Sequence, residues 1–90
     1  MEKNIYYQQI RGINQFTNFE TLRKDIRHYG WKVHDEENPG EIPMKKVTIS
    51  KRFDHLPDIE SEGLGKDDYT AMCNAYNILL LRLSKWKEPQ

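Results

Sequence analysis

Apolar and polar positions follow two different periods along this chain, and the changes of period predict its elements. From Phe19 to Tyr29 the apolar residues recur three or four positions apart, which is the period of one helix face. Gly30 follows and can adopt the positive φ that often ends a helix. Residues 17–20 have the spacing of a capping box, in which Thr17 would accept a backbone amide and Glu20 would reach back to the cap. We therefore predict a helix over 18–29.

A two-residue period replaces the helical one in the middle of the chain. Residues 31–34 alternate, and residues 46–51 alternate again and are rich in β-branched side chains, which is typical of strands. The Asn, Pro and Gly residues of 37–43 predict a loop between them, and 54–57 predicts a turn. Residues 58–61 are expected to form a short third strand.

A second helical pattern closes the chain. Its apolar stripe is wide enough to predict a helix lying across a sheet. Asp67 or Asp68 can cap its start, the Gly63-Leu64-Gly65 segment before it predicts a turn, and Pro89 limits its extension. The stripe consists of Tyr69, Met72, Cys73, Tyr76, Leu80, Leu83 and Trp86, and it is flanked by Ala71, Ala75, Ile78, Leu79 and Arg82.

The first residues fit two patterns. Ile5 and Tyr7 alternate as in a strand, whereas Ile5, Gln9 and Ile13 lie at helical spacing, and the helix is favoured. The expected order is helix, three strands, helix, with an extra N-terminal helix. It defines one α+β domain over 1–90, with an N-terminal extension (1–16), a core (17–86) and a tail (87–90).

Charge is balanced over the whole chain but not along it. The sequence has 14 basic and 14 acidic residues, whereas nucleic-acid binders usually carry a basic excess. Residues 1–34 and 43–53 are net basic, whereas 35–42 and 54–68 are net acidic. Two interpretations stay open: one face of the domain is basic despite the zero sum, or oppositely charged loops solvate one another.

Catalytic and metal chemistry lack a recognisable motif. His28, His34 and His55 are not spaced as metal ligands, and Cys73 is the single cysteine, so neither a zinc site nor a disulfide is expected. The sequence lacks the long glycine-rich loop that binds nucleotides. We expect no enzyme activity and no cofactor. The start of the chain lacks the apolar run of a signal peptide, and the longest aliphatic run, Ile78–Leu81, is too short for a membrane span. These features predict an intracellular protein, in the cytoplasm, nucleus or mitochondrion.

The segment 43–83 resembles the C-terminal part of a double-stranded RNA-binding domain. In that family the third strand ends in a Gly-x-Gly turn, which Gly63 and Gly65 match, and a helix rich in alanine follows. Ala71 and Ala75 match its small residues, and the closing aliphatic residues match Leu79, Leu80 and Leu83. The proline-containing stretch 47–65 is similar to copies in some DExH RNA helicases. The resemblance implies a helix, three antiparallel strands and a helix, with both helices on one face of the sheet.

The resemblance also implies an RNA interface, which this chain keeps only in part. Where the family places helix lysines that straddle phosphates, this sequence has Asp68, Tyr69 and Met72. The residues that the resemblance leaves for RNA contact are Arg23, Arg27, Lys45, Lys46 and Lys66. Lys24 is a further candidate for the contact from the first helix.

Two functions and a third possibility therefore remain open from the sequence. The domain could bind structured RNA, weakly or within a larger assembly. It could instead be a degenerate copy that binds a protein partner or a second copy of itself, through a sheet edge or through Tyr69 and Met72. The third possibility is an unrelated small α+β fold.

Overall fold

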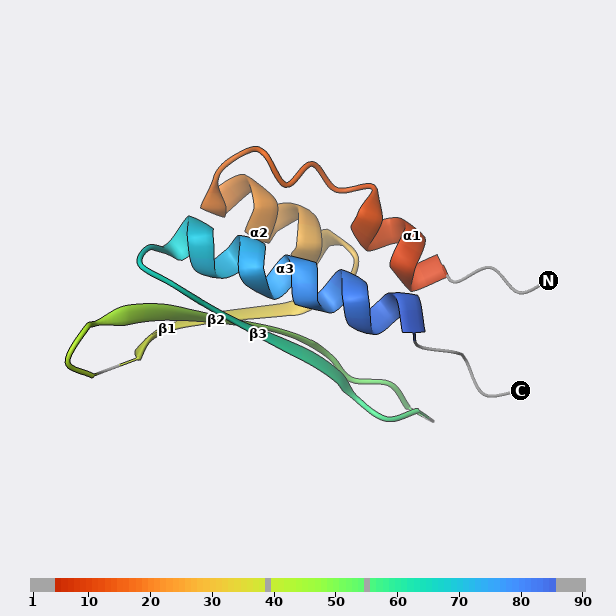
Figure 1. The fold of residues 1–90 in the computed structure, drawn as a ribbon. Coiled ribbons are helices and arrows are strands. Elements are labelled where there is room, and N and C mark those ends of the chain that lie inside the picture. The colour runs from red at the N-terminus through yellow and green to blue at the C-terminus, as the bar shows by residue number, and fades with distance from the viewer. Residues whose placement is uncertain (1–4, 39, 55, 86–90) are drawn as a thin grey trace.

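Three helices lie on one face of a three-stranded antiparallel sheet in the computed structural model of the chain (Figure 1), which describes residues 5–38, 40–54 and 56–85. This arrangement confirms the predicted α+β class and the extra N-terminal helix. The elements in chain order are α1 (Ile5–Arg11), α2 (Phe19–His28), β1 (Lys32–Asn38), β2 (Met44–Lys51), β3 (Ile59–Gly65) and α3 (Asp68–Lys85). Pro39, His55, Trp86 and Pro89, which entered the sequence predictions, lie outside the described residues.

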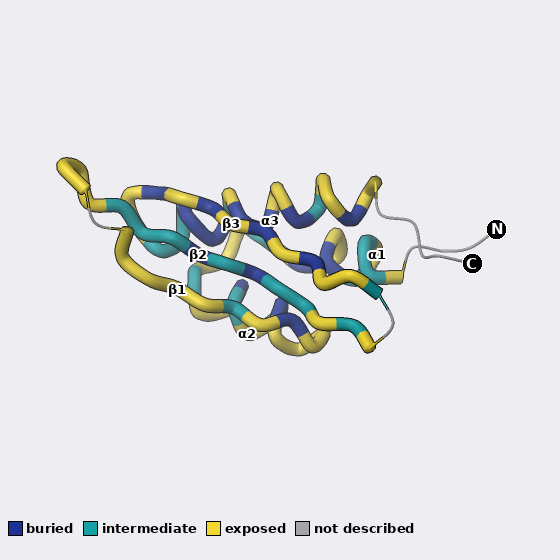
Figure 2. Tube along the Cα trace, turned by 90° about the horizontal axis from the view of Figure 1, so that it is seen from below, coloured by how far each residue is buried: buried dark blue, intermediate teal, exposed yellow. Residues whose placement is uncertain are grey.

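The sheet has β2 in its centre, and its two faces differ in burial. Val47 and Ile49 are buried beneath the helices, whereas Lys46 and Thr48 project from the opposite face, because successive strand residues point to opposite sides. Figure 2 shows this uncovered face, along which β1 is exposed over most of its length. The open face is therefore polar, and the core lies between the sheet and the helices.

Both strands of the first hairpin are longer than the sequence predicted. β1 continues to Asn38 and β2 begins at Met44, so the loop is shorter than the predicted 37–43. The reason is cross-strand pairing, since Glu36 lies opposite Lys46 and Glu37 opposite Lys45. Acidic residues are poor strand formers on their own. Opposite charges at facing positions stabilise the pairing of the two strands and offset this preference.

The predicted turn at Gly63 and Gly65 is wrong, because both glycines lie inside β3 and neither has a positive φ. Their role is close packing. A Cβ at Gly63 would lie 2.2 Å from the Ala75 backbone nitrogen and 2.3 Å from the Ala71 carbonyl oxygen. The absent side chains let α3 approach the sheet, and the small Ala71 and Ala75 face the glycines, as the resemblance implied.

The buried face of α3 is centred one position away from the predicted stripe. Ala71, Ala75 and Leu79, predicted as flanks, are fully buried, because they lie over the glycine-containing strand. Tyr69 and Cys73 are half-buried at the border of that face. On the exposed side of α3, the Asn74 side-chain amide donates to the Leu64 carbonyl of β3 at 2.6 Å. The described core of α3 is Ala71, Met72, Ala75, Tyr76, Leu79 and Leu83.

Asn18, rather than the predicted Thr17, caps α2. The Asn18 Oδ1 accepts the Thr21 backbone amide at 2.9 Å, and Glu20 pairs with Arg23 instead of reaching back to the cap. Asparagine is at least as good a cap as threonine and stands one residue nearer to the first helical turn. At the other end Gly30 has a φ of 88°, which confirms the predicted helix stop.

The N-terminal helix is held to the core by buried side chains. Ile10 is fully buried and Ile13 nearly so. The buried Tyr76 hydroxyl donates to the Ile10 carbonyl at 2.8 Å, which links α3 to α1. Residues that the sequence assigned to an extension thus supply part of the core.

Replacing Tyr76 by phenylalanine is expected to lower the free energy of unfolding by about 1–2 kcal/mol. The substitution keeps the ring but leaves the Ile10 carbonyl without this buried donor. Urea unfolding followed by circular dichroism measures the change. Tyr29→Phe is the matched control, because Tyr29 lies at the surface; equal stability of the two variants would contradict a structural role for the Tyr76 hydroxyl.

Candidate nucleic-acid interface

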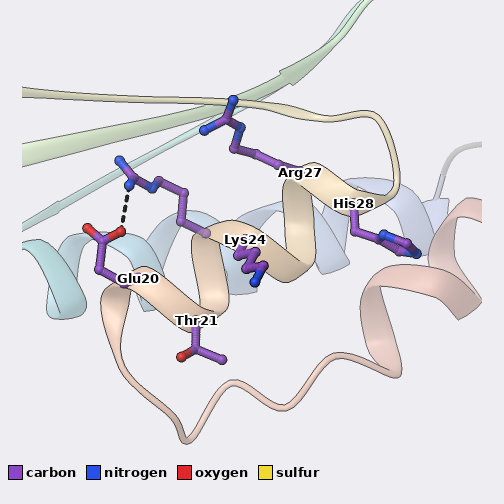
Figure 3. Close-up of a pocket in the computed structure, with 6 residues that line it drawn as sticks. Glu20, Thr21, Lys24, Arg27 and His28 are labelled. Atoms are coloured by element: carbon purple, nitrogen blue, oxygen red, sulfur yellow. Dashed lines mark hydrogen bonds and ion pairs between the residues drawn. The ribbon is translucent and has the colours of Figure 1, made fainter.

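The outer face of α2 gathers basic side chains around a shallow hollow (Figure 3). Leu22 and Ile26 point into the core, and the opposite side of the helix is exposed at Thr21, Lys24, Arg27 and His28. The hollow is lined by Glu20, Thr21, Arg23, Lys24, Arg27 and His28, all from this one helix. Four of these six side chains are basic types, so the face suits an anionic ligand.

The charged groups of this hollow are not equally available. Arg23 pairs with Glu20 and also lies over the Phe19 ring, with its guanidinium carbon 5.5 Å from the ring centroid. Lys24 and Arg27 are exposed, and neither forms an ion pair with another residue in the described ranges. They are therefore the cations of α2 that a phosphate can reach at the least cost.

The two predicted lysines of β2 point to opposite faces of the sheet and are both paired with acids. Lys45 shares the helix side with Val47, and its Nζ lies 3.0 Å from the Glu37 carboxylate. Lys46 projects from the open face, 3.6 Å from Glu36 and 3.5 Å from Glu62. Because adjacent strand residues diverge in this way, one RNA surface cannot contact both lysines together.

The start of α3 is already occupied by its own carboxylates. Asp67 Oδ1 accepts the Thr70 backbone amide at 2.7 Å, which confirms one of the two predicted caps. This hydrogen bond lowers the pKa of Asp67 below its usual value, because it stabilises the charged carboxylate. Asp68 follows within the first turn. A phosphate at this helix end would meet two negative charges, with only the exposed Lys66 beside them.

Charged groups of the β1–β2 hairpin and of the start of α3 interact with one another. The pKa of Lys45 is raised, first by its hydrogen bond and charge interaction with Glu37, and further by Asp68 and Asp35. Figure 1 accordingly places the β1–β2 hairpin and the beginning of α3 at the same end of the molecule. Acidic groups of both elements surround the sheet lysine there.

The five residues predicted for RNA contact therefore fall into separate environments. Arg23 and Arg27 share the outer face of α2, Lys45 and Lys46 lie on opposite sides of β2, and Lys66 precedes α3. The set of five left out His28, and it left out Lys24 although the sequence offered Lys24 as a contact on the first helix. Both residues lie on the side of the helix away from Leu22 and Ile26, and this helical spacing could have placed them in the site.

The predicted partner surface at Tyr69 and Met72 is wrong. Met72 is fully buried, because it belongs to the hydrophobic core cluster of the domain. The Tyr69 hydroxyl donates to the Gln15 carbonyl at 2.7 Å and holds the α1–α2 connection. Cys73 is half-buried beside the same carbonyl, with its Sγ 4.0 Å from the oxygen. These side chains serve the interior of the domain.

Lys51 is a further cation that the fold uses internally. Its Nζ donates to the Tyr29 carbonyl at 2.9 Å. It also lies 5.4, 5.6 and 6.0 Å from the ring centroids of Tyr6, Trp31 and Phe53. Cation–π contacts of this kind stabilise a packed side chain, so Lys51 fastens α1 to the sheet and has little freedom to reach a ligand.

The described residues also bear on metal binding and on membrane insertion. Over 5–38, 40–54 and 56–85, no group of three or more acidic, histidine or cysteine side chains could hold a metal ion. Among the helices of these ranges, none is both long and apolar enough to span a membrane.

Comparisons of the chain with protein-family models, with curated proteins and with solved structures found no match.

Proposed function

We propose that this domain binds structured RNA weakly, through the outer face of α2. The observation that carries the proposal is the exposed cluster of Lys24, Arg27 and His28 around one hollow, with Arg23 at its border. The α+β architecture supports it, because double-stranded RNA-binding domains recognise RNA by shape and by contacts to phosphates and 2′-hydroxyls. A helix with a basic outer face can make such contacts without recognising a particular RNA sequence.

The charge pattern supports weak rather than tight binding. Phosphate neutralisation dominates nucleic-acid affinity, and the chain carries no net positive charge. Lys24 and Arg27 would give the main phosphate contacts. Arg23 must share its guanidinium with Glu20, Lys45 and Lys46 are paired with acids, and Lys66 stands next to Asp67. A larger assembly that supplies further contacts fits this balance.

The double substitution Lys24→Ala and Arg27→Ala is expected to abolish most of the binding to duplex RNA. Loss of two phosphate contacts should reduce the dependence of log affinity on log salt by about 2. Fluorescence anisotropy with labelled duplex RNA at two salt concentrations measures both quantities. Lys66→Ala should weaken binding much less, because Asp67 and Asp68 already offset its charge.

Lys32→Ala combined with Arg52→Ala is the matched control, since it removes the same charge from exposed positions outside α2 and outside the hollow. Equal losses in the two double variants would mean that only net charge matters. If the unmodified domain shows no binding even at low salt, the proposed function is wrong.

The second candidate function, a protein-interaction or dimerisation module, is favoured by the β1–β2 hairpin. It carries Asp35, Glu36, Glu37 and Glu41, and next to them Ile42 is 80% exposed. An acidic hairpin with an apolar tip suits a basic protein surface. Light scattering separates the self-associating form of this alternative from RNA binding, because a stable dimer that Ile42→Asp converts to monomer would favour the module.

A further inference from the structure

We propose that the domain binds one groove of a short RNA helix through α2 alone, instead of spanning two successive grooves. The proposal rests on the RNA binding proposed above and names the substrate class of that same face. A complete double-stranded RNA-binding domain contacts two minor grooves and the major-groove phosphates between them, over about 16 base pairs. α2 has ten residues and is therefore only about 15 Å long.

The hairpin cannot supply the second groove contact. Its cations, Lys45 and Lys46, already pair with Glu37, Glu36 and Glu62. Counting Asp35, Glu36, Glu37 and Glu41 against the two lysines leaves the segment 35–46 with a charge of −2. An RNA strand at this hairpin would have to break ion pairs and would then face the uncompensated acids.

The start of α3 cannot supply the major-groove contact either. A phosphate is attracted to a helix N-terminus by free amides and by the dipole. Here the Asp67 carboxylate accepts the Thr70 amide, and Asp68 adds a second negative charge in the first turn. With Lys66 counted, residues 66–68 carry −1.

These two acidic segments lie together at one end of the fold, because Lys45 of the hairpin is paired with Gly65, two residues before Asp67. The basic face of α2 remains as the part that attracts RNA. An RNA helix longer than α2 makes no further contact with the domain. Lengthening the duplex beyond one groove should therefore not increase the affinity of the domain for a single site on it. Short stems are the substrates that such a contact can use in full.

The first test compares duplex RNAs of about 8 and about 20 base pairs, which lie on either side of the span of a complete domain. After correction for the number of overlapping sites, the affinities measured by anisotropy should agree within about twofold, and the salt dependence should be equal. Binding to the long duplex only would overturn this inference and leave the proposed function intact. Binding to neither duplex would reject both.

The second test frees Lys45 from its ion pair and leaves Lys46 with Glu62 as its remaining partner. Glu36→Gln with Glu37→Gln removes ion-pair partners of Lys46 and Lys45 and keeps the side-chain shapes. Affinity for the long duplex should then rise several-fold while affinity for the short duplex stays the same. The matched control is Asp54→Asn with Glu60→Gln, which changes the net charge equally at exposed positions outside the hairpin. A gain that is the same for both duplex lengths, or the same in the control, would overturn the inference.

Discussion

Replacing Gly63 by alanine is expected to lower the free energy of unfolding by about 3 kcal/mol or more, near the upper end for overpacking. The new Cβ would lie 2.2 Å from the Ala75 nitrogen and 2.3 Å from the Ala71 oxygen. Both are backbone atoms of α3, so the contact can be relieved only by moving the whole helix away from the sheet. Chains of this size have a total stability of about 5–13 kcal/mol. Urea unfolding measured by circular dichroism gives the loss.

Gly40→Ala is the control for this substitution. Gly40 lies in the exposed hairpin loop, where the nearest atom to an added Cβ is the Ile42 carbonyl oxygen at 3.9 Å. Its stability should differ from that of the unmodified domain by no more than about 0.5 kcal/mol. If Gly63→Ala unfolds at the same urea concentration as Gly40→Ala, the close contact between α3 and β3 is not present in solution.

Replacing Ile10 by alanine should lower the free energy of unfolding by about 2–5 kcal/mol. Ile10 is fully buried in the core, and its removal leaves a cavity where α1 packs against α3. The same denaturation experiment measures the change. The loss should appear as a shift of the single unfolding transition, because α1 packs on the same core as the other helices.

Ile5→Ala provides a matched control from the same helix. Ile5 is 57% exposed, so the identical change of side chain should cost much less there. Similar stability of the two variants would show that α1 is a dispensable extension. A large difference would show that the domain begins before residue 17, earlier than the core boundary predicted from sequence.

The helical parts of the fold were predictable because each carries its own period. The stripe over 19–29 and the apolar pattern over 69–83 locate α2 and α3 without knowledge of their partners. Gly63 and Gly65 are different, since alternate glycines look alike in a turn and in a strand packed under a helix. Only the pairing of Gly63 with Val47 and the nearness of α3 distinguish the two, and both are long-range properties.

The candidate site was predictable to the extent that it lies on one helix. The direction of Arg23 and Arg27 follows from the positions of Leu22 and Ile26, and the same reasoning extends to Lys24. The state of Lys45 and Lys46 depends on strand register, which decides which acids face them. The predicted loop was longer than the real one, so this register could not be derived from the sequence.

A row of three charged side chains crosses the open face of the sheet: Glu36, Lys46 and Glu62. This row favours one strand register over others during folding. Lys46 faces Glu36 directly and reaches Glu62 diagonally on the third strand. A two-residue slip of β1 keeps every side chain on its proper face but would place Lys46 opposite His34 or Asn38. The polar face would then lose its charge matching, although the buried face would still be apolar at Val33. The ion pairs that engage Lys46 thus discriminate against misaligned sheets.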